Sequence, residues 1–423
     1  MLRKKSPLPS AHKGFFHVVS TDEARELISR LQPVSSEVIP VAEGAGRVVA
    51  RAMRSPIDLP HFDRAVMDGY AVRAADTFGS SESQPTYLRL TGTIEMGERP
   101  ESELAAGCAM RIATGGMLPP GADAVVMVEY TEEVAGGLVE IRRGVAPWEH
   151  VQRVGEDVRR GTRLFARGQR LRPLDLGALT GVGFTRISVF TRPKVALICT
   201  GDELVPPDRR PRPGQVRNVN EYSLVAMAAA AGAQVTDLGI VRDRPEELRR
   251  ALEQALSEHD AVLLSGGSSV GVKDMALQII ASFPRSRVLF HGISVAPGKP
   301  TLLALCDKKP VLGLPGHPQS ALVIFALFGA PLIRVLGGEQ AAAAFRWPAV
   351  IPAVLAEGIA SQPGREDYVR VILEEKGNER MAYPLPGKSA SIYNLVHADG
   401  LIRIPAQAEG IEAGAPVEVL LLH

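Results

Sequence analysis

Three acidic residues, Glu203, Asp243 and Asp274, each follow an apolar segment with the composition of a β-strand. These segments are residues 194–200, 234–241 and 260–265. Open α/β sheets bind ligands at the carboxyl ends of their strands, so the three acids are expected to lie near one another. Carboxylates gathered there can hold Mg²⁺, a hard cation that also takes water and substrate phosphate as ligands. The alternative is that each acid only forms a turn or caps a helix.

A glycine-rich turn, SGGSSVGVKD at residues 265–274, follows the third of these segments. A turn that opens a helix presents backbone N–H groups to an anion, and the helix dipole favours the negative charge. The candidate phosphate-binding residues of this turn are Gly266, Gly267, Ser269 and Gly271. The chain contains neither the P-loop pattern nor the G-x-G-x-x-G pattern, which argues against a P-loop NTPase and an ordinary dinucleotide enzyme.

Three other residues are candidates for a ligand contact. Lys299 lies in APGKP, where a glycine and two prolines fix the backbone, so an anion contact is favoured over a free surface lysine. His317 lies in GLPGHPQSA after a strand-like segment, and a simple turn residue explains it equally well. Asp68 lies in LPHFDRAVMDGYAV, residues 59–72, which could equally be a solvated turn.

The elements that must position these residues are predicted from hydrophobic periodicity. From residue 193 onward strand-like and helix-like segments alternate, which predicts a doubly wound, mostly parallel α/β sheet. Short strand-like runs broken by glycine and proline predict a small inserted β domain, and the β-like texture near the end predicts a C-terminal barrel-like domain. The expected division is 18–57 with 151–190 as a discontinuous N-terminal mixed α/β domain, 58–150 as the inserted β domain, 191–338 as the α/β domain and 339–423 as the C-terminal β domain.

The overall composition excludes several classes of protein. Lysine and arginine number 48 against 47 aspartates and glutamates, so the formal charge of +1 argues against a nucleic-acid partner. The three cysteines are far apart and form no C-x-x-C pair, which argues against a disulfide framework or structural zinc and favours a reducing compartment. The apolar stretch 321–333 is too short to span a bilayer, and the N-terminus has no apolar signal core. A cytoplasmic protein without a membrane partner is expected.

Seven motifs occur in the order typical of one protein family. They are LPHFDRAVMDGYAV (59–72), RIATGGMLPPGADAVVMVE (111–129), GEDVRRG (155–161), CTGDEL (199–204), SGGSSVG (265–271), PGKP (297–300) and GLPGHP (313–318). Over roughly residues 20 to 405 the chain closely resembles the molybdopterin molybdenumtransferase family, which includes the E domain of gephyrin. The resemblance implies the last step of molybdenum cofactor synthesis, in which adenylylated molybdopterin and molybdate give the cofactor and AMP, with Mg²⁺ required.

The resemblance also implies which residues act. The implied catalytic residues are Asp68, Thr114, Asp157, Glu203, Asp243 and Asp274, of which Glu203, Asp243 and Asp157 would hold Mg²⁺. The implied substrate-binding residues are Gly201, Gly266, Gly267, Ser269, Gly271, Lys299, Pro315 and Pro318. An elongated homodimer is implied, with each site between the α/β domain of one subunit and the β insert of the other. Transient contact with the molybdopterin adenylyltransferase is also expected.

The chain departs from the usual family pattern at several positions. Arg64 and Gln152 stand where asparagine and arginine are usual, and His317 replaces an asparagine. Two lysines that often precede PGKP are replaced by Gly292 and Ala296. The site of an oxyanion has therefore lost two cations.

These departures leave alternatives open. Arg64, Lys273 and Lys299 are the candidates to replace the lost positive charge. A paralogue that prefers tungstate to molybdate would carry such changes. A molybdopterin-binding scaffold without catalysis is the other alternative, and the presence of all the implied acids argues against it.

Overall fold

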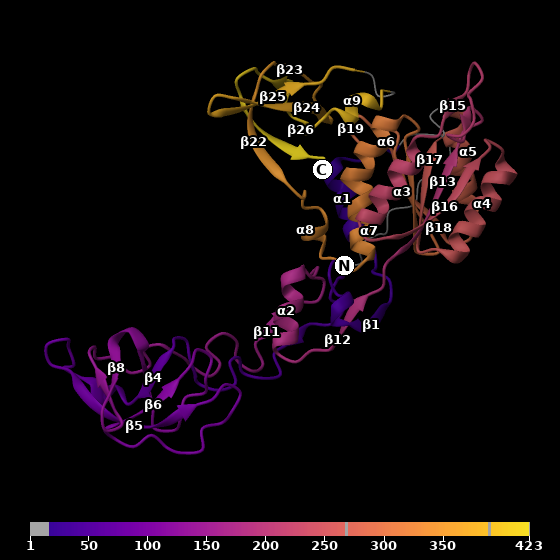
Figure 1. Cartoon of the computed structure of the whole chain (residues 1–423). Helices are drawn as coiled ribbons and strands as arrows, with labels where there is room; N and C mark the ends of the chain where they lie inside the picture. Colours follow the sequence, from indigo (N-terminus) through magenta and orange to yellow (C-terminus); the bar gives the residue numbers. More distant parts are fainter. Residues whose placement is uncertain (1–16, 267–269, 388–390, 423) are drawn as a thin grey trace, which may run out of the picture.

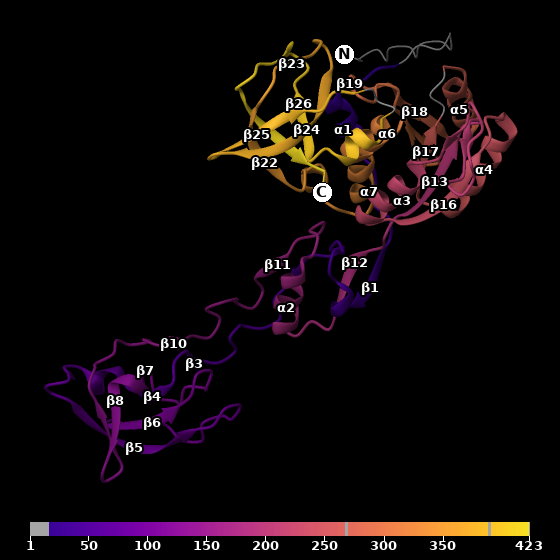
Figure 2. The ribbon, with the colours of Figure 1, turned by 45° about the horizontal axis from the view of Figure 1, so that its top comes forward.

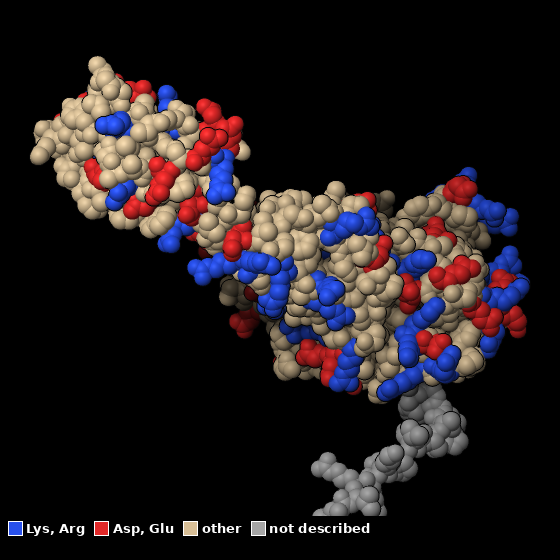
Figure 3. All heavy atoms as spheres, turned by 90° about the horizontal axis from the view of Figure 1, so that it is seen from below, with Lys and Arg blue, Asp and Glu red and all other residues tan. Residues whose placement is uncertain are grey.

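A computed structural model describes residues 17–266, 270–387 and 391–422, except for the side chains of residues 270–274. The molecule is elongated, and one β region is held away from the rest (Figure 1, Figure 2). Both signs of charge are interspersed over the face in Figure 3, in keeping with the formal charge of +1.

The central sheet has six strands in the order β16-β13-β17-β21-β20-β18. The first four are mutually parallel, whereas β20 and β18 run antiparallel to their neighbours. The strands are β13 (Lys194–Thr200), β16 (Gln234–Val241), β17 (Ala261–Gly266), β18 (Ser286–His291), β20 (Leu302–Cys306) and β21 (Lys309–Leu314). The short strands β14 (Leu204–Val205) and β15 (Val216–Arg217) pair beside the sheet. This arrangement confirms the predicted mostly parallel α/β architecture.

Helices cover the central sheet on both faces. They are α3 (Asn220–Ala230), α4 (Pro245–Glu258), α5 (Val270–Ser282), α6 (Pro318–Ile324) and α7 (Ala330–Leu336). Leu197 packs with α3, α6 and α7 on one face, and its neighbour Ile198 packs with α4 and α5 on the other. Because both faces are buried, the strands are almost continuously apolar in sequence, as parallel sheets usually are.

The long apolar run Pro318–Leu336 is a core element of this region. Its mean hydropathy of 1.8 would suit a membrane span, but 89% of it is buried inside the structure, and it is the one such run in the described part of the chain. A π-helical turn, η4 (Phe325–Gly329), separates α6 from α7. Pro331 lacks an N–H and its ring would clash with a regular preceding turn, so the wider turn fits this sequence.

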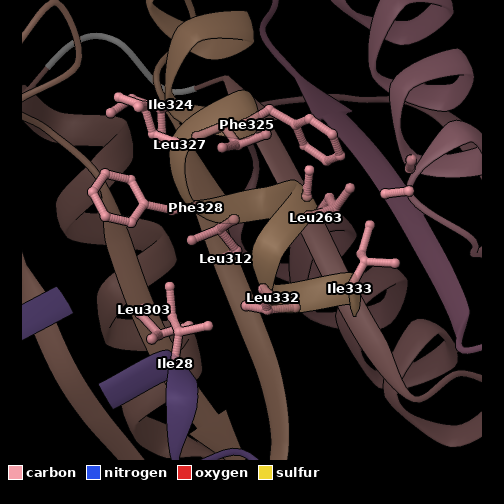
Figure 4. Close-up of a cluster of buried hydrophobic side chains, with 14 of the residues drawn as sticks. Ile28, Leu263, Leu303, Leu312, Ile324, Phe325, Leu327, Phe328, Leu332 and Ile333 are labelled. Carbon is pink, nitrogen blue, oxygen red and sulfur yellow. The ribbon is translucent and has the colours of Figure 1, made fainter. Parts of the chain in front are cut away.

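The N-terminal region combines a helix with two short strand pairs. It contains α1 (Thr21–Ser29), β1 (Ser36–Pro40), η1 (Val41–Glu43), β2 (Met53–Arg54), β11 (Arg163–Phe165), α2 (Pro173–Gly181) and β12 (Arg186–Phe190). Strand β1 pairs with β12, and β2 pairs with β11. Ile28 of α1 packs in the same apolar cluster as Leu303 and Phe328, so this helix contacts the core of the α/β region (Figure 4). The division into domains given above stays a prediction.

The inserted β region forms a sheet with the order β7-β4-β6-β5-β9-β8. Its elements are β3 (Arg64–Ala65), β4 (Gly69–Val72), η2 (Ala74–Thr77), β5 (Thr86–Ile94), β6 (Cys108–Ile112), β7 (Ala124–Met127), η3 (Val128–Tyr130), β8 (Thr131–Val134), β9 (Leu138–Ile141) and β10 (Val151–Gln152). Tyr70 and Val72 face one apolar cluster, and Ala71 faces a second. The insert therefore has its own core.

The C-terminal region is a closed barrel. Strand β24 pairs with both β25 and β26, and β22 and β28 complete a ring of five strands. Its elements are β22 (Val350–Leu355), β23 (Ile359–Ala360), β24 (Glu366–Lys376), β25 (Glu379–Pro384), α9 (Tyr393–Val396), β26 (Gly400–Ile404), β27 (Gly410–Ile411) and β28 (Pro416–Leu421). The short strand β19 (Val295–Ala296) pairs with β24, and α8 (Ala341–Ala344) leads into the barrel. The predicted barrel-like fold is confirmed.

Phe328 offers a test of this core. It is fully buried, so Phe328→Ala should lower the free energy of unfolding by about 3–5 kcal/mol, the usual result of emptying a large core site. Phe78→Ala is the matched control, because Phe78 is 62% exposed and its loss should cost about 0.5 kcal/mol or less. Urea unfolding would be followed by Trp347 fluorescence in a Trp148→Phe background. Equal midpoints for the two variants would contradict the packing described.

Candidate active site

The acidic ends of β13 and β16 meet at one edge of the central sheet. Thr200, the last residue of β13, donates its hydroxyl to Asp243 Oδ1 at 2.5 Å. The backbone N–H of Asp243 donates to Asp202 Oδ1 at 3.3 Å. Because β13 and β16 are adjacent and parallel, their carboxyl ends bring these groups together. The Asp243 carboxylate is thus held in place beside the loop that carries Glu203.

Glycine is required where β17 ends next to β13. Gly266 has φ +135°, and a Cβ at this position would lie 2.0 Å from the carbonyl oxygen of Thr200. Any side chain would force the two strand ends apart. The edge beside Asp243 is therefore lined partly by bare backbone.

A cavity of 780 Å³ opens at this edge of the sheet. It is lined by strand-end residues and by the turn that precedes α6, including Thr200, Glu203, Ser265, Gly266, Gly316, His317 and Pro318. Apolar side chains such as Val216 and Ile392 complete the wall. The mixture of apolar walls and a few convergent polar groups is typical of a small-molecule site.

A second cavity of 550 Å³ borders the same turn. Gly316 and His317 line both cavities, so the two cavities adjoin at the turn 315–318. Pro315 lines the second cavity, and Pro318 lines the first. Gly298 also borders the second cavity, where a Cβ would lie 2.2 Å from Ile324 Cγ1.

Two basic side chains line the second cavity. Lys299 lines it, as does Arg365 from the C-terminal region. Arg365 is fixed by Asp367, whose Oδ1 accepts from its Nε at 2.8 Å. Ala296, one of the two positions where a lysine is usual, also lines this cavity. Gly292, the other such position, is buried and precedes Ala296 closely in the sequence. Lys299 thus supplies a positive charge at this cavity, whereas the charge of Arg365 is paired with that of Asp367.

Asp68 and Thr114 form a small polar unit on the inserted β region. Asp68 Oδ1 accepts hydrogen bonds from the Thr114 backbone N–H at 2.7 Å and from its hydroxyl at 2.9 Å. These two bonds, the backbone one first, stabilise the carboxylate and lower the pKa of Asp68 below its usual value. Asp68 therefore stays ionised at neutral pH, and both residues are exposed to solvent.

Two of the departures from the family pattern pair with each other. Arg64 donates from Nε and Nη2 to Gln152 Oε1 at 2.9 and 2.7 Å. They are direct partners in the β3–β10 ladder. Arg64 is therefore engaged inside the β insert, and within one chain it does not restore charge to the cavity at Lys299.

The structure brings some of the expected site residues together and keeps others apart. Glu203 and Asp243 lie at one edge, together with Gly201 and Gly266. Asp68, Thr114 and Asp157 lie on or beside the β insert, which is far from that edge within one chain (Figure 1, Figure 2). Gly267 and Ser269 lie outside the described residues, and Gly271 and Asp274 fall in α5 where side chains are not described.

The metal assignment stays a prediction. Among the described residues, histidine, cysteine, aspartate and glutamate form no group of three or more that could hold a metal ion. Glu203 and Asp243 offer two carboxylates from adjacent loops. Mg²⁺ commonly binds through one or two carboxylates together with substrate phosphate and water, so these two residues fit that ion.

Three residues of the cavity walls are not marked by the sequence. Asn220 begins α3, where an asparagine is usually explained as a helix cap. Tyr393 and Arg365 come from the C-terminal region and reach the two cavities only through folding. No motif spacing connects them with the strand ends, so only their place in the structure identifies them.

The Asp68–Thr114 contact predicts a measurable change in acidity. Thr114→Val removes the hydroxyl donor and keeps the backbone N–H, so the pKa of Asp68 should rise toward its ordinary value without reaching it. The measurement is the pH titration of the Asp68 carboxyl ¹³C signal. Thr114→Ser keeps the hydroxyl and should leave the titration unchanged. An unaltered titration in the valine variant would show that the hydroxyl bond is absent.

Comparisons with known proteins cover almost the whole chain. Family models match at residues 19–183 (MoeA N-terminal region, domain I and II), 196–335 (probable molybdopterin binding domain) and 352–422 (MoeA C-terminal region, domain IV). A Methanocaldococcus jannaschii protein named for molybdopterin biosynthesis is 35% identical over 100% of this chain and 99% of its own. The molybdopterin molybdenumtransferase of Nostoc is 34% identical over 92% of this chain and 89% of its own.

A solved structure agrees with these sequence matches. The molybdopterin biosynthesis MoeA protein of Pyrococcus horikoshii has a TM-score of 0.80 and 36% identity, and the alignment covers 96% of this chain and 99% of that one. The similarity thus includes the β insert, the central α/β region and the C-terminal barrel in one order. On these grounds, the chain belongs to the MoeA family.

Proposed function

We propose that this chain is a molybdopterin molybdenumtransferase, which inserts molybdate into adenylylated molybdopterin and releases AMP. The observation that carries the proposal is the pair of cavities that share the turn 315–318. A reaction between a large nucleotide-linked pterin and a small oxyanion needs two adjoining compartments. The relatives named molybdopterin molybdenumtransferase, together with the family match, support the same activity.

Each cavity suits one of the two substrates. The cavity of 780 Å³ has the size and the partly apolar wall that a flat ring system needs, and the bare backbone at Gly266 suits a phosphate group. The cavity of 550 Å³ places Lys299 and Arg365 where an oxyanion would bind. Because Gly316 and His317 border both spaces, an oxyanion in one would lie beside the pterin in the other.

Glu203 and Asp243 are the residues of this chain that would hold Mg²⁺. Thr200 keeps the Asp243 carboxylate in a fixed orientation, and Glu203 lines the cavity from the neighbouring loop. When bound, Mg²⁺ would neutralise charge that develops on the pyrophosphate as AMP departs. Asp157 would join them only from a partner subunit, because it lies beside the β insert of its own chain.

A homodimer with shared sites is part of the proposal. Asp68 and Thr114 are exposed on an insert that stands away from the cavities of its own chain. The Asp68 carboxylate is ionised, exposed and held by two hydrogen bonds, so it does not contribute to the packing of the core of the insert. A two-fold dimer would carry this unit to the partner's cavity, and the partner would return the same contact.

The proposal also includes the location and the partners of the protein. Cys199 and Cys306 are buried free thiols, which fits a cytoplasmic, reducing location. Transient contact with the adenylyltransferase would deliver the substrate, and nucleic-acid or membrane partners are not proposed. The loss of lysine at Gly292 and Ala296 supports one second candidate, a transferase that prefers tungstate.

The activity is tested by AMP release from adenylylated molybdopterin. We expect release only when Mg²⁺ and an oxyanion are supplied together, because charge neutralisation and the incoming oxyanion are both needed. Molybdate and tungstate in parallel reactions measure the oxyanion preference. Binding of the substrate without AMP release under any of these conditions would instead identify a scaffold.

The proposed metal ligands predict a selective loss of activity. Glu203→Gln and Asp243→Asn should each lower AMP release on the order of 100-fold or more, since each change removes a charged ligand while keeping the side-chain shape. Asp208→Asn is the control, an exposed acid in the segment between β14 and β15, and should act like the wild type. The measurement is the initial rate across a Mg²⁺ titration. Wild-type rates in the Glu203 and Asp243 variants would remove the metal assignment.

Subunit mixing tests the shared site. Asp68→Ala and Asp243→Ala homodimers should both be inactive, because every site lacks one residue. Random exchange of equal amounts makes about half of the dimers mixed, and each mixed dimer has one intact site, so about a quarter of the wild-type AMP release should return. Background activity after verified exchange would show that each site is built within one chain.

A further inference from the structure

A third cavity, of 370 Å³, lies where the α/β region meets the C-terminal barrel. Its wall is built by the end of α3, by η4, α7 and α8, and by strand β28 of the barrel (Figure 1). It shares no lining residue with the cavities of 780 and 550 Å³. It is therefore a separate site, and the proposed transferase reaction does not account for it.

The apolar part of this wall comes from both regions of the chain. The π-helical turn η4 contributes Phe325, Ala326 and Leu327. Trp347 and Leu420 line the cavity from the side of the barrel. Apolar and aromatic walls of this kind suit the body of a small organic ligand, and π-helical turns within helices are frequent at functional sites.

The polar part of the wall is positively charged. The described residues that line the cavity include no aspartate or glutamate and four arginines, namely Arg25, Arg334, Arg346 and Arg403. Arg25 is paired with Asp22 at 2.8 Å, and Arg403 forms a salt bridge with Glu366. Arg334 and Arg346 form no salt bridge within the described part of the chain. The cavity therefore has positive charge that no carboxylate balances.

Arg334 of α7 is the cation best placed to bind an anion. Its Nη1 donates to the carbonyl oxygen of Ala344 at 3.2 Å, so the guanidinium is held beside another residue of the cavity wall. Its Nε and Nη2 have no hydrogen-bond partner among the described residues, and they are not among the fully buried atoms in that state. These two donors are therefore open to a ligand. Burial lowers the pKa of Arg334, and the charge of Glu339 offsets this only in part.

We propose that this cavity binds an amphipathic carboxylate, a ligand with an apolar body and one anionic head group. The body would lie against η4 and Trp347, and the carboxylate would accept hydrogen bonds from Nε and Nη2 of Arg334. These two donors lie on one edge of the guanidinium, whose planar fork matches the two oxygens of a carboxylate. The inference goes beyond the proposed function, because binding here needs neither molybdopterin nor turnover.

Four probes test the charge and the apolar body of the ligand separately. Octanoate is compared with octanol, which lacks the charge, with octylamine, which reverses it, and with acetate, which lacks the tail. Trp347 fluorescence reports binding in a Trp148→Phe background, because Trp347 lines the cavity and the chain has two tryptophans. We expect octanoate to bind at least about tenfold more tightly than each of the others, since only octanoate gains both the charge-assisted bonds and the apolar burial. Octanol binding as tightly as octanoate, or no binding of octanoate, would overturn the proposal without any variant at Arg334.

Variants then assign the preference to this side chain. Arg334→Met keeps the apolar stem and removes the charge, so the preference for octanoate over octanol should fall to about onefold. Arg250→Met is the matched control, because Arg250 is an exposed arginine of α4 whose Nε donates to the carbonyl oxygen of Glu246 in its own helix. It should keep the wild-type ratio. A preference that survives in Arg334→Met would overturn the assignment to Arg334.

A second variant tests the location without removing any charge. Ala326→Leu adds volume to the cavity wall at η4 and leaves Arg334 in place, so octanoate should bind at least about tenfold more weakly. Urea unfolding of each variant checks that the fold is kept. Unchanged octanoate affinity in Ala326→Leu would show that octanoate binds elsewhere and would overturn the proposal.

Discussion

The central sheet is buried on both faces, and this constraint decides where polar chemistry can lie. Leu197 and Ile198 of β13 point to opposite helical layers, so neither face of the strand can carry a functional polar group at low cost. Polar side chains therefore gather beyond the last apolar residue, where Thr200 meets Asp243. Gly266 lets β17 end within contact of β13 at the same edge. The cavity of 780 Å³ lies at this edge, where Thr200 and Gly266 form part of its wall.

The β insert is separated from this edge for a physical reason. Its sheet has an apolar cluster on each side, so it needs no contact with the α/β region to bury its own side chains. An independently stable insert can stand away from the rest of the chain and present Asp68 and Thr114 to solvent. In the proposed dimer, the projecting insert of one subunit would form part of the wall of the other subunit's site.

The departures from the family pattern differ in their consequences. Arg64 and Gln152 exchange the positions of a cation and an amide, and the two side chains bond to each other, so the exchange is balanced locally. The changes at Gly292 and Ala296 have no such partner. They reduce the charge near the smaller cavity and leave Lys299 and Arg365 as its cations. In the proposed function, that second change would weaken or alter the binding of the oxyanion.

The sequence by itself determined the fold class and the family, and it predicted one edge of the site. Continuous apolar segments alternating with helical ones predicted the parallel sheet, because burial on both faces leaves a pattern in the sequence. Acids after those segments predicted that Glu203 and Asp243 would lie close, since parallel strands end at one edge. Only the tertiary structure decided that Arg365 and Tyr393 complete the cavity walls and that Asn220 is fixed by two other segments. Sequence patterns report local periodicity and which face is buried. They do not report which side-chain atom is left unpaired after packing, because that depends on partners far away along the chain.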